Sequence, residues 1–449
     1  MRSIIIVKQL LPGLFASLGS VANAQTLTGE FTFREPPEQV VLWSTTGADH
    51  DRIDSTPVRG SGHFDFAERE YPAGFYQLSI NDSDRVDIIL DPRERVVELQ
   101  FHGKPLQEHV SVIASLENQR MWKYKLVSRN AQAELQVNRE KRGGAAATDI
   151  HALMRLDSAD QMIRARQEQD LERLIDEDTT SYFGHVVRGD RRLMAAIPNG
   201  FQAIKEAFDW TDGRMLRSSI RSKAIMAVLQ SVPMDWENGL ARAADSLLFW
   251  SREREECWSH TRDVLVELFA VYGPDHVAQY LVDTYVVGAG ALVPANARLR
   301  SVAADLIRVT VGARAPEILL PTSTGDTVHV TDMLGRNTFT CLFFYSSTCD
   351  HCHAQLPGLR VLYDELHERG FELVGIALDA DTAEFNAMIA EEHIMWPSYT
   401  EAIGWGSKAA KAYAVKSTPS FFLLSREGSI VAKPQDHEEL RSFLEKALE

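Results

Sequence analysis

The chain has 449 residues, more than one hydrophobic core usually organises, so two or three domains are expected. Its 45% hydrophobic and 24% charged content is ordinary for globular protein. The net charge of −16 leaves no basic excess to neutralise phosphates, which argues against nucleic acid and an anionic membrane surface as partners.

The first 24 residues have the pattern of an export signal. Arg2 and Lys8 supply positive charge, a mostly apolar stretch follows, and Ala22-Asn23-Ala24 has the small-residue pattern of a cleavage site. We therefore predict a signal peptide over residues 1–24, cleavage after Ala24 and a periplasmic location. No later apolar stretch reaches the roughly 18 residues that a membrane span needs, so none is expected after cleavage.

Residues 25–105 contain short runs such as Phe31-Thr32-Phe33 and Phe64-Asp65-Phe66, separated by turns such as Glu35-Pro36-Pro37. Alternating runs about ten residues apart are typical of a small antiparallel β-sandwich. Over residues 106–310 the apolar residues change to a helical spacing. This predicts an all-α middle region, to which the sequence assigns no function.

The last part of the chain alternates between strand and helix patterns. Buried strands are expected over residues 338–345 and 371–378, a hairpin over 421–432 and a final helix over 438–448. This order predicts an α/β domain over residues 311–449, with a central sheet covered on both faces.

Four cysteines are too few for a disulfide framework in a chain of this length. Cys257 and Cys341 are interpreted as packed structural thiols, whereas Cys349 and Cys352 form a close pair. An aromatic run ends just before Cys349, and helical spacing of apolar residues begins at Cys352. We therefore expect a strand, a tight turn and a helix that begins at Cys349.

A sulfur at the start of a helix faces unpaired backbone N–H groups and the positive end of the helix dipole. This favours the thiolate, so Cys349 is the predicted nucleophile of a thiol–disulfide oxidoreductase. Between the cysteines, His351 can stabilise the thiolate by charge or hydrogen bonding, whereas Asp350 opposes it.

Residues 315–449 resemble the thioredoxin-fold domain of the exported thiol–disulfide oxidoreductases of the TlpA and ResA group. The positions that carry this resemblance are Pro316, the early turn at Gly325-Asp326, Cys349-Asp350-His351-Cys352, the helix-kinking Pro357, and Tyr413-Ala414-Val415-Lys416-Ser417-Thr418-Pro419-Ser420. The order of β-rich, helical and thioredoxin-like parts is similar to the multidomain exported thioredoxin-like proteins of Bacteroidetes.

The resemblance implies that Cys349 is the accessible nucleophile and that Cys352, more buried, resolves the mixed disulfide. The redox-active disulfide Cys349–Cys352 would then be the only redox group. A cis Thr418-Pro419 bond is expected to face the pair and to leave nearby backbone free for an extended substrate. The expected partners are protein disulfides or dithiols and an upstream reductant or oxidant, with a reductase or isomerase role favoured over net oxidation.

Three positions depart from the family's pattern. Thr348 stands where a tryptophan usually precedes the first cysteine, and Phe343 where cytosolic thioredoxins carry a buried aspartate. Gln355 stands where ResA-like proteins often have a glutamate. With no carboxylate at these positions, the candidates that remain for accepting the proton of Cys352 are His353, Glu401 and solvent.

Three other interpretations remain open. Cys349 to His353 also matches the C-x-x-C-H pattern of c-type haem attachment, with His353 as an axial ligand. Alternatively, two thiolates with His351 or His353 would bind copper or zinc, as in copper-delivery proteins that resemble this fold. Third, the chain is a binding or assembly protein whose first two domains carry the main role. Under the oxidoreductase interpretation, the β-rich and helical regions are expected to select clients, form a homodimer or space the active site.

Overall fold

The computed structural model describes residues 24–46, 49–144, 149–233, 238–322 and 326–448. The predicted signal peptide, except Ala24, and Gly325 of the predicted early turn lie outside the described residues. The chain divides into two compact units, Met1–Ser231 and Val232–Glu449.

The first unit begins with two four-stranded sheets, ordered β4-β1-β7-β8 and β3-β2-β5-β6. Apolar residues of both sheets, among them Leu27, Phe64, Leu42 and Leu78, pack into one buried core. This confirms the predicted sandwich. The strands are β1 (Thr26–Phe31), β2 (Gln39–Thr46), β3 (Asp49–Pro57), β4 (His63–Asp65), β5 (Gly74–Ser79), β6 (Arg85–Leu90), β7 (Val96–Phe101) and β8 (Val110–Ala114).

Two details of the sandwich differ from the expectation. β1 and β7 pair in parallel, although the other pairings in these two sheets are antiparallel. β8 pairs with β7 and lies past residue 105, so the sandwich extends into the region that we predicted as helical. The alternation in Val110-Ser111-Val112 fits a half-buried strand better than a helix.

Gln25, just before β1, is fully buried. Its side-chain amide donates to the carbonyl oxygens of Asp91 at 2.6 Å and Glu94 at 2.9 Å. Its side-chain oxygen accepts a hydrogen bond from the backbone N–H of Tyr71 at 3.3 Å. Gln25 therefore ties the start of the sandwich to two loops.

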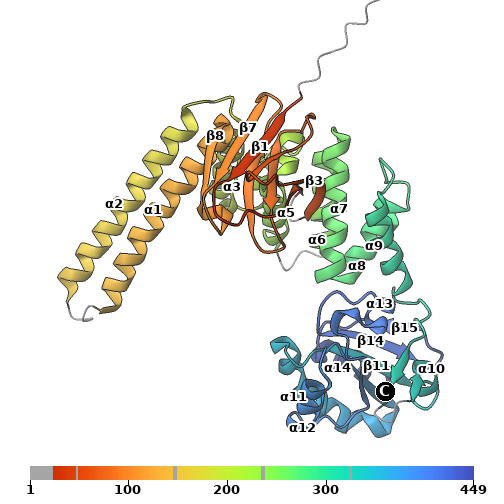
Figure 1. The fold of residues 1–449 in the computed structure, drawn as a ribbon. Helices are drawn as coiled ribbons and strands as arrows, with labels where there is room; N and C mark the ends of the chain where they lie inside the picture. The colour runs from red at the N-terminus through yellow and green to blue at the C-terminus, as the bar shows by residue number, and fades with distance from the viewer. Residues whose placement is uncertain (1–23, 47–48, 145–148, 234–237, 323–325, 449) are drawn as a thin grey trace, which may run out of the picture. The chain divides into compact units, whose positions relative to one another are not determined.

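Helices complete the first unit. α1 and α2 run side by side as a long hairpin (Figure 1), joined by ion pairs such as Arg166–Glu134. The buried carboxylate of Glu117 in α1 accepts hydrogen bonds from Ser181, Tyr182 and Phe183, at the N-terminus of α3. The helices are α1 (Leu116–Gly144), α2 (Ile150–Asp176), α3 (Tyr182–Ala196), α4 (Phe201–Ala207) and α5 (Ser219–Gln230), with 3-10 turns at Leu106–Glu108, Ile197–Asn199 and Gly213–Arg217.

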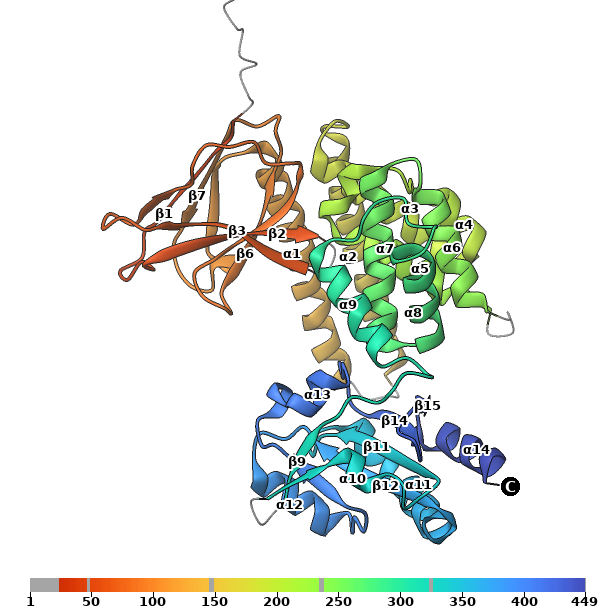
Figure 2. The ribbon, with the colours of Figure 1, turned by 90° about the vertical axis from the view of Figure 1, so that its right-hand side faces the viewer.

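The second unit starts with helices and continues into an α/β part. α7, α8 and α9 pack against one another (Figure 2). The bounds are α6 (Gly239–Ser251), α7 (Glu255–Tyr272), α8 (Asp275–Leu281), a π turn (Val282–Val286) and α9 (Ala297–Arg308). These helices and those of the first unit confirm the predominantly helical middle region.

The α/β part is built on one five-stranded sheet of order β13-β12-β11-β14-β15. β11 lies in its centre, parallel to β12 and antiparallel to β14. The elements are β9 (Leu319–Pro321), β10 (Thr327–His329), α10 (Val330–Met333), β11 (Phe339–Tyr345), α11 (Asp350–Leu366), β12 (Phe371–Ala377), α12 (Thr382–Glu391), β13 (Ser398–Thr400), α13 (Lys408–Ala412), β14 (Ser420–Ser425), β15 (Ile430–Ala432) and α14 (His437–Ala447), with 3-10 turns at His367–Arg369 and Gly404–Gly406.

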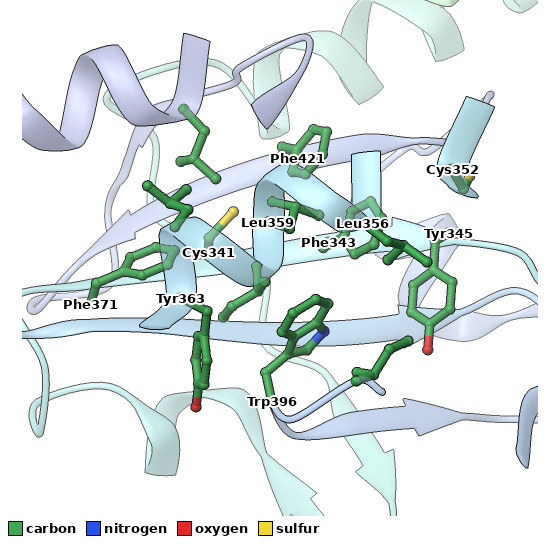
Figure 3. Packing of buried hydrophobic residues seen from close by; sticks show 14 of the residues in the cluster. Cys341, Phe343, Tyr345, Cys352, Leu356, Leu359, Tyr363, Phe371, Trp396 and Phe421 are labelled. Atoms are coloured by element: carbon green, nitrogen blue, oxygen red, sulfur yellow. The ribbon is translucent and has the colours of Figure 1, made fainter. Parts of the chain in front are cut away.

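Alternate residues of β11 face opposite sides of this sheet, as a strand requires. Phe343 and Tyr345 pack with Leu356 and Leu359 of α11 in one buried cluster (Figure 3). Leu342 and Phe344 of β11 belong to a second cluster, together with Ala409 and Ala410 of α13. Both faces are therefore covered, as predicted. No helix within the described residues is long and apolar enough to cross a membrane.

Candidate active site

The first cysteine of the pair occupies the N-terminal cap of α11. β11 ends at Tyr345, a short turn follows, and Cys349 adopts extended backbone angles of φ −97° and ψ 104°. Its sulfur accepts a hydrogen bond from the backbone N–H of Cys352 at 3.2 Å. A capping atom at this place meets the unpaired N–H groups at the start of the helix and the positive end of the helix dipole.

The second cysteine lies one turn into the same helix. Cys352 is fully buried, whereas Cys349 is partly exposed. Burial, reinforced by the hydrogen bond with Cys349, raises the pKa of the Cys352 thiol to about 12. Cys352 is therefore a protonated thiol near neutral pH. The two sulfurs are not joined by a disulfide in this structure.

The Thr418-Pro419 bond is cis, as the resemblance led us to expect. The carbonyl oxygen of Thr418 lies 3.5 Å from the sulfur of Cys349, which donates to it as a thiol. The segment before β14 thus faces the cysteine at the N-terminus of α11. Pro357 lies inside α11, as expected from the family's helix kink.

Asp350 and His351, the two residues between the cysteines, are both exposed to solvent. They lie at the first turn of α11. Asp350 places a negative charge at the positive end of the helix, where it interacts favourably with the dipole.

The two positions that lack a carboxylate have other roles. Phe343 is fully buried and stacks between Tyr345 and Phe421, with ring centroids 5.0 Å and 4.9 Å away. The side-chain oxygen of Gln355 accepts hydrogen bonds from the backbone N–H of His437 at 2.9 Å and from its ring Nδ1 at 2.8 Å. Gln355 therefore attaches the start of α14 to α11.

The two candidate proton acceptors are also engaged. Glu401 accepts hydrogen bonds from the Ser407 hydroxyl and the Ala409 N–H, which fixes the start of α13. Its carboxylate therefore caps a helix.

His353 uses both ring nitrogens. Nε2 lies 2.8 Å from the carbonyl oxygen of Ser347, and Nδ1 lies 3.0 Å from the carboxylate of Glu392. Both partner oxygens are hydrogen-bond acceptors, an arrangement that favours the protonated imidazole, in which both ring nitrogens donate. The hydrogen bond to Ser347, followed by the one to Glu392, raises the pKa of His353 accordingly. Because both ring nitrogens are engaged by acceptor oxygens, neither is placed to take the proton of Cys352.

A buried carboxylate that the sequence analysis did not single out lies beside the turn before Cys349. Asp379 is 3% exposed, and its Oδ1 accepts hydrogen bonds from the Ser346 hydroxyl at 2.9 Å, the Ser347 N–H at 2.9 Å and the Ser347 hydroxyl at 3.0 Å. Its Oδ2 is buried without a hydrogen-bond partner in the described part of the chain. The carboxyl ends of neighbouring parallel strands lie at the same edge of a sheet. An acidic residue just after β12 could therefore have been expected beside the end of β11.

Cys257 and Cys341 are both fully buried. Cys341 lies within the cluster under α11 (Figure 3), and burial raises the pKa of its thiol. These environments fit packed thiols. No group of three histidine, cysteine, aspartate or glutamate side chains suited to a metal ion occurs among the described residues.

Alkylation should separate the two active-site thiols. Near neutral pH, the reduced folded chain is expected to take iodoacetamide at Cys349, with Cys352 reacting more than about a hundredfold more slowly because so little of it is thiolate. Peptide mass mapping against time measures both rates. Labelling of Cys352 should rise as the pH approaches 12, its pKa in the folded chain. Equal rates at the two sites near neutral pH would contradict this assignment, and the unfolded chain, labelled at all its cysteines, is the control.

These features define a class: a thioredoxin-fold domain whose C-x-x-C pair begins a helix opposite a cis-proline. Comparisons agree with it. The AhpC/TSA family matches residues 311–433. Thiol-disulfide oxidoreductase ResA of Bacillus cereus is 30% identical over 148 residues, which are 32% of this chain and 82% of that protein. The chain belongs to the TlpA/ResA-like family of thioredoxin-fold thiol–disulfide oxidoreductases.

Solved structures are similar to different lengths of this chain. A C-terminal domain of a putative thiol-disulfide oxidoreductase from Bacteroides thetaiotaomicron is 24% identical and covers 31% of this chain and 97% of that one, with a TM-score of 0.30. A thioredoxin-like protein from Bacteroides caccae is 14% identical and covers 55% of this chain and 93% of that one, with a TM-score of 0.40.

Proposed function

We propose that this chain is a periplasmic oxidoreductase that reduces or isomerises protein disulfides through Cys349 and Cys352. The observation that carries this proposal is the placement of the two sulfurs. One caps a helix and is partly exposed, and the other is a buried thiol one turn further on. Thr418 and Pro419 complete the site opposite Cys349.

The reaction proceeds in two exchanges. The Cys349 thiolate attacks one sulfur of a client disulfide, forming a mixed disulfide and releasing the other client sulfur as a thiolate. Cys352 then loses its proton and attacks the Cys349 sulfur. This forms the Cys349–Cys352 disulfide and releases the second client sulfur. The client gains two electrons and two protons, and an upstream dithiol reductant restores the enzyme. In isomerisation, a client thiol displaces Cys349 before Cys352 attacks.

The predicted export of the chain supports the proposed disulfide reductase or isomerase function. The pattern over residues 1–24 predicts a signal peptide that is cleaved after Ala24. An oxidising compartment supplies the protein disulfides on which such an enzyme acts. The partners are therefore exported proteins with disulfides or dithiols, together with the upstream reductant.

Substituting Cys352→Ser tests the function directly. Attack by Cys349 would continue but resolution would stop, so covalent enzyme–client complexes are expected to accumulate. Non-reducing electrophoresis should show them, reduction should release them, and mass spectrometry should identify the clients. The double substitution Cys349→Ser with Cys352→Ser is the matched control and should trap nothing. Equal trapping by both variants, or by neither, would contradict the proposal.

A further inference from the structure

The helices of the second unit contact the segments around the redox site. Lys433, just after β15, forms an ion pair with Asp275 at the start of α8. Lys416, just before the cis-proline, lies 3.6 Å from the carboxylate of Asp305 in α9. The Ser417 hydroxyl donates to the carbonyl oxygen of Val271, near the end of α7, at 3.5 Å. The junction of α7 and α8 therefore lies beside the segment that carries Thr418-Pro419.

A cleft of about 510 Å³ lies between these parts. The ends of α7 and α9 line one wall, and the segments 413–422 and 433–436 line the other. His351 and Gln355 of α11 also line it, as does Thr418, whose carbonyl oxygen is 3.5 Å from the Cys349 sulfur. A volume of this size falls in the range of about 300–1,000 Å³ that is common for binding sites. The cleft thus extends to His351 and Thr418, which lie next to Cys349.

The chemistry of the walls favours one kind of occupant. Val271, Val302 and Leu306 give the helical wall an apolar character, and Tyr272, also in the lining, is 77% exposed. Both cleft lysines are paired with aspartates, so neither offers a free positive charge. The charged lining residues are three aspartates and two lysines, a net charge of −1: Asp275, Asp305, Asp436, Lys416 and Lys433. An anionic small disulfide such as oxidised glutathione matches this lining poorly.

We propose that the end of α7 and helix α9 form the second wall of the client site. This site takes an extended polypeptide segment next to the client's disulfide, with apolar side chains and a neutral or positive charge. Tyr272 is the contact residue that this proposal assigns on the helical wall. The proposal rests on the proposed function, and it gives part of the helical region a role in choosing clients.

The test uses the full chain, whose cysteines are reduced beforehand. It measures the single-turnover rate constant for the reaction of this reduced chain with each of two disulfide substrates. One substrate is a synthetic peptide closed by a disulfide and flanked by leucine and valine, and the other is bis(2-hydroxyethyl) disulfide. Tyr272→Ala is expected to lower the rate constant for the peptide about five- to tenfold and to leave that for the small disulfide within about twofold. Phe249→Ala, at a 57% exposed aromatic of α6 outside the cleft, is the matched control and should change neither.

A second pair of peptides tests the charge preference. They differ only in a lysine or a glutamate beside the disulfide, and the glutamate peptide is expected to react about threefold more slowly. Equal rates for this pair would overturn the assigned client chemistry. A Tyr272→Ala chain with unchanged rates, or with equal losses on both substrates, would overturn the second wall. If the wild-type chain reduced neither the first peptide nor the small disulfide, the proposed function itself would fail.

Discussion

Substituting Cys349→Ser is expected to lower the rate of disulfide reduction by at least about a thousandfold. A serine hydroxyl stays protonated near neutral pH, so no anionic nucleophile remains at the helix terminus. The fold should be retained, since serine is itself a favoured N-cap residue and would accept the same hydrogen bond from the N–H of Cys352. Reduction of insulin or of a model disulfide, followed beside a thermal unfolding curve, measures both effects.

The matched control is another cysteine-to-serine substitution. Cys257 is fully buried in α7 and lies outside the redox site. Cys257→Ser is expected to lower the free energy of unfolding by about 1–3 kcal/mol, because it buries a polar hydroxyl, but to keep reductase activity. Activity retained by Cys349→Ser would refute the role of Cys349 as nucleophile.

Substituting Asp379→Ala is expected to lower the free energy of unfolding by about 2–4 kcal/mol. The Ser347 N–H and the hydroxyls of Ser346 and Ser347 would lose the acceptor that now holds them. The turn they form leads directly to Cys349, so the rate of disulfide reduction should fall about tenfold as well. Urea unfolding gives the first quantity, and single-turnover reduction of a model disulfide gives the second.

Two variants test whether Asp379 acts by positioning the turn before Cys349 or only through its negative charge. Asp379→Asn keeps an oxygen that can accept the same donors, and it should recover most of the activity. Asp381→Ala removes an exposed carboxylate nearby that caps α12 through the N–H of Ala383. It should cost about 1 kcal/mol and leave the rate of reduction unchanged. If Asp379→Ala and Asp381→Ala had equal effects on that rate, the positioning role of Asp379 would be refuted.

The parts of the site that the sequence predicted depend on local patterns. The apolar, aromatic run of β11, the helical spacing from Cys352 to Leu366 and the close spacing of the two cysteines all lie within one short stretch. The cis bond at Thr418-Pro419 required the family resemblance, because a threonine before proline does not by itself favour cis. Each of these features is set by neighbours along the chain or by a motif that the family preserves.

Features that depend on distant pairing were not predictable in the same way. The parallel pairing of β1 with β7 joins strands that are far apart in the sequence, and no turn between them sets their direction. Asp379 becomes part of the site only because β12 lies next to β11. The ion pair of Lys433 with Asp275 likewise joins two segments whose sequences carry no sign of each other. Strand order and helix docking decide these contacts, and neither is encoded in local periodicity.

The burial of Gln25 would limit chemistry at the start of the chain once the signal peptide predicted over residues 1–24 is removed. The predicted cleavage after Ala24 would make Gln25 the first residue. An N-terminal glutamine closes to a pyroglutamyl ring when its amino nitrogen attacks the carbonyl carbon of its own side-chain amide and ammonia leaves. Here the side-chain amide of Gln25 donates hydrogen bonds to the carbonyl oxygens of Asp91 and Glu94 inside the sandwich. Ring closure, or trimming by an aminopeptidase, would first have to pull Gln25 out of its site. The fold therefore protects the new terminus from both reactions.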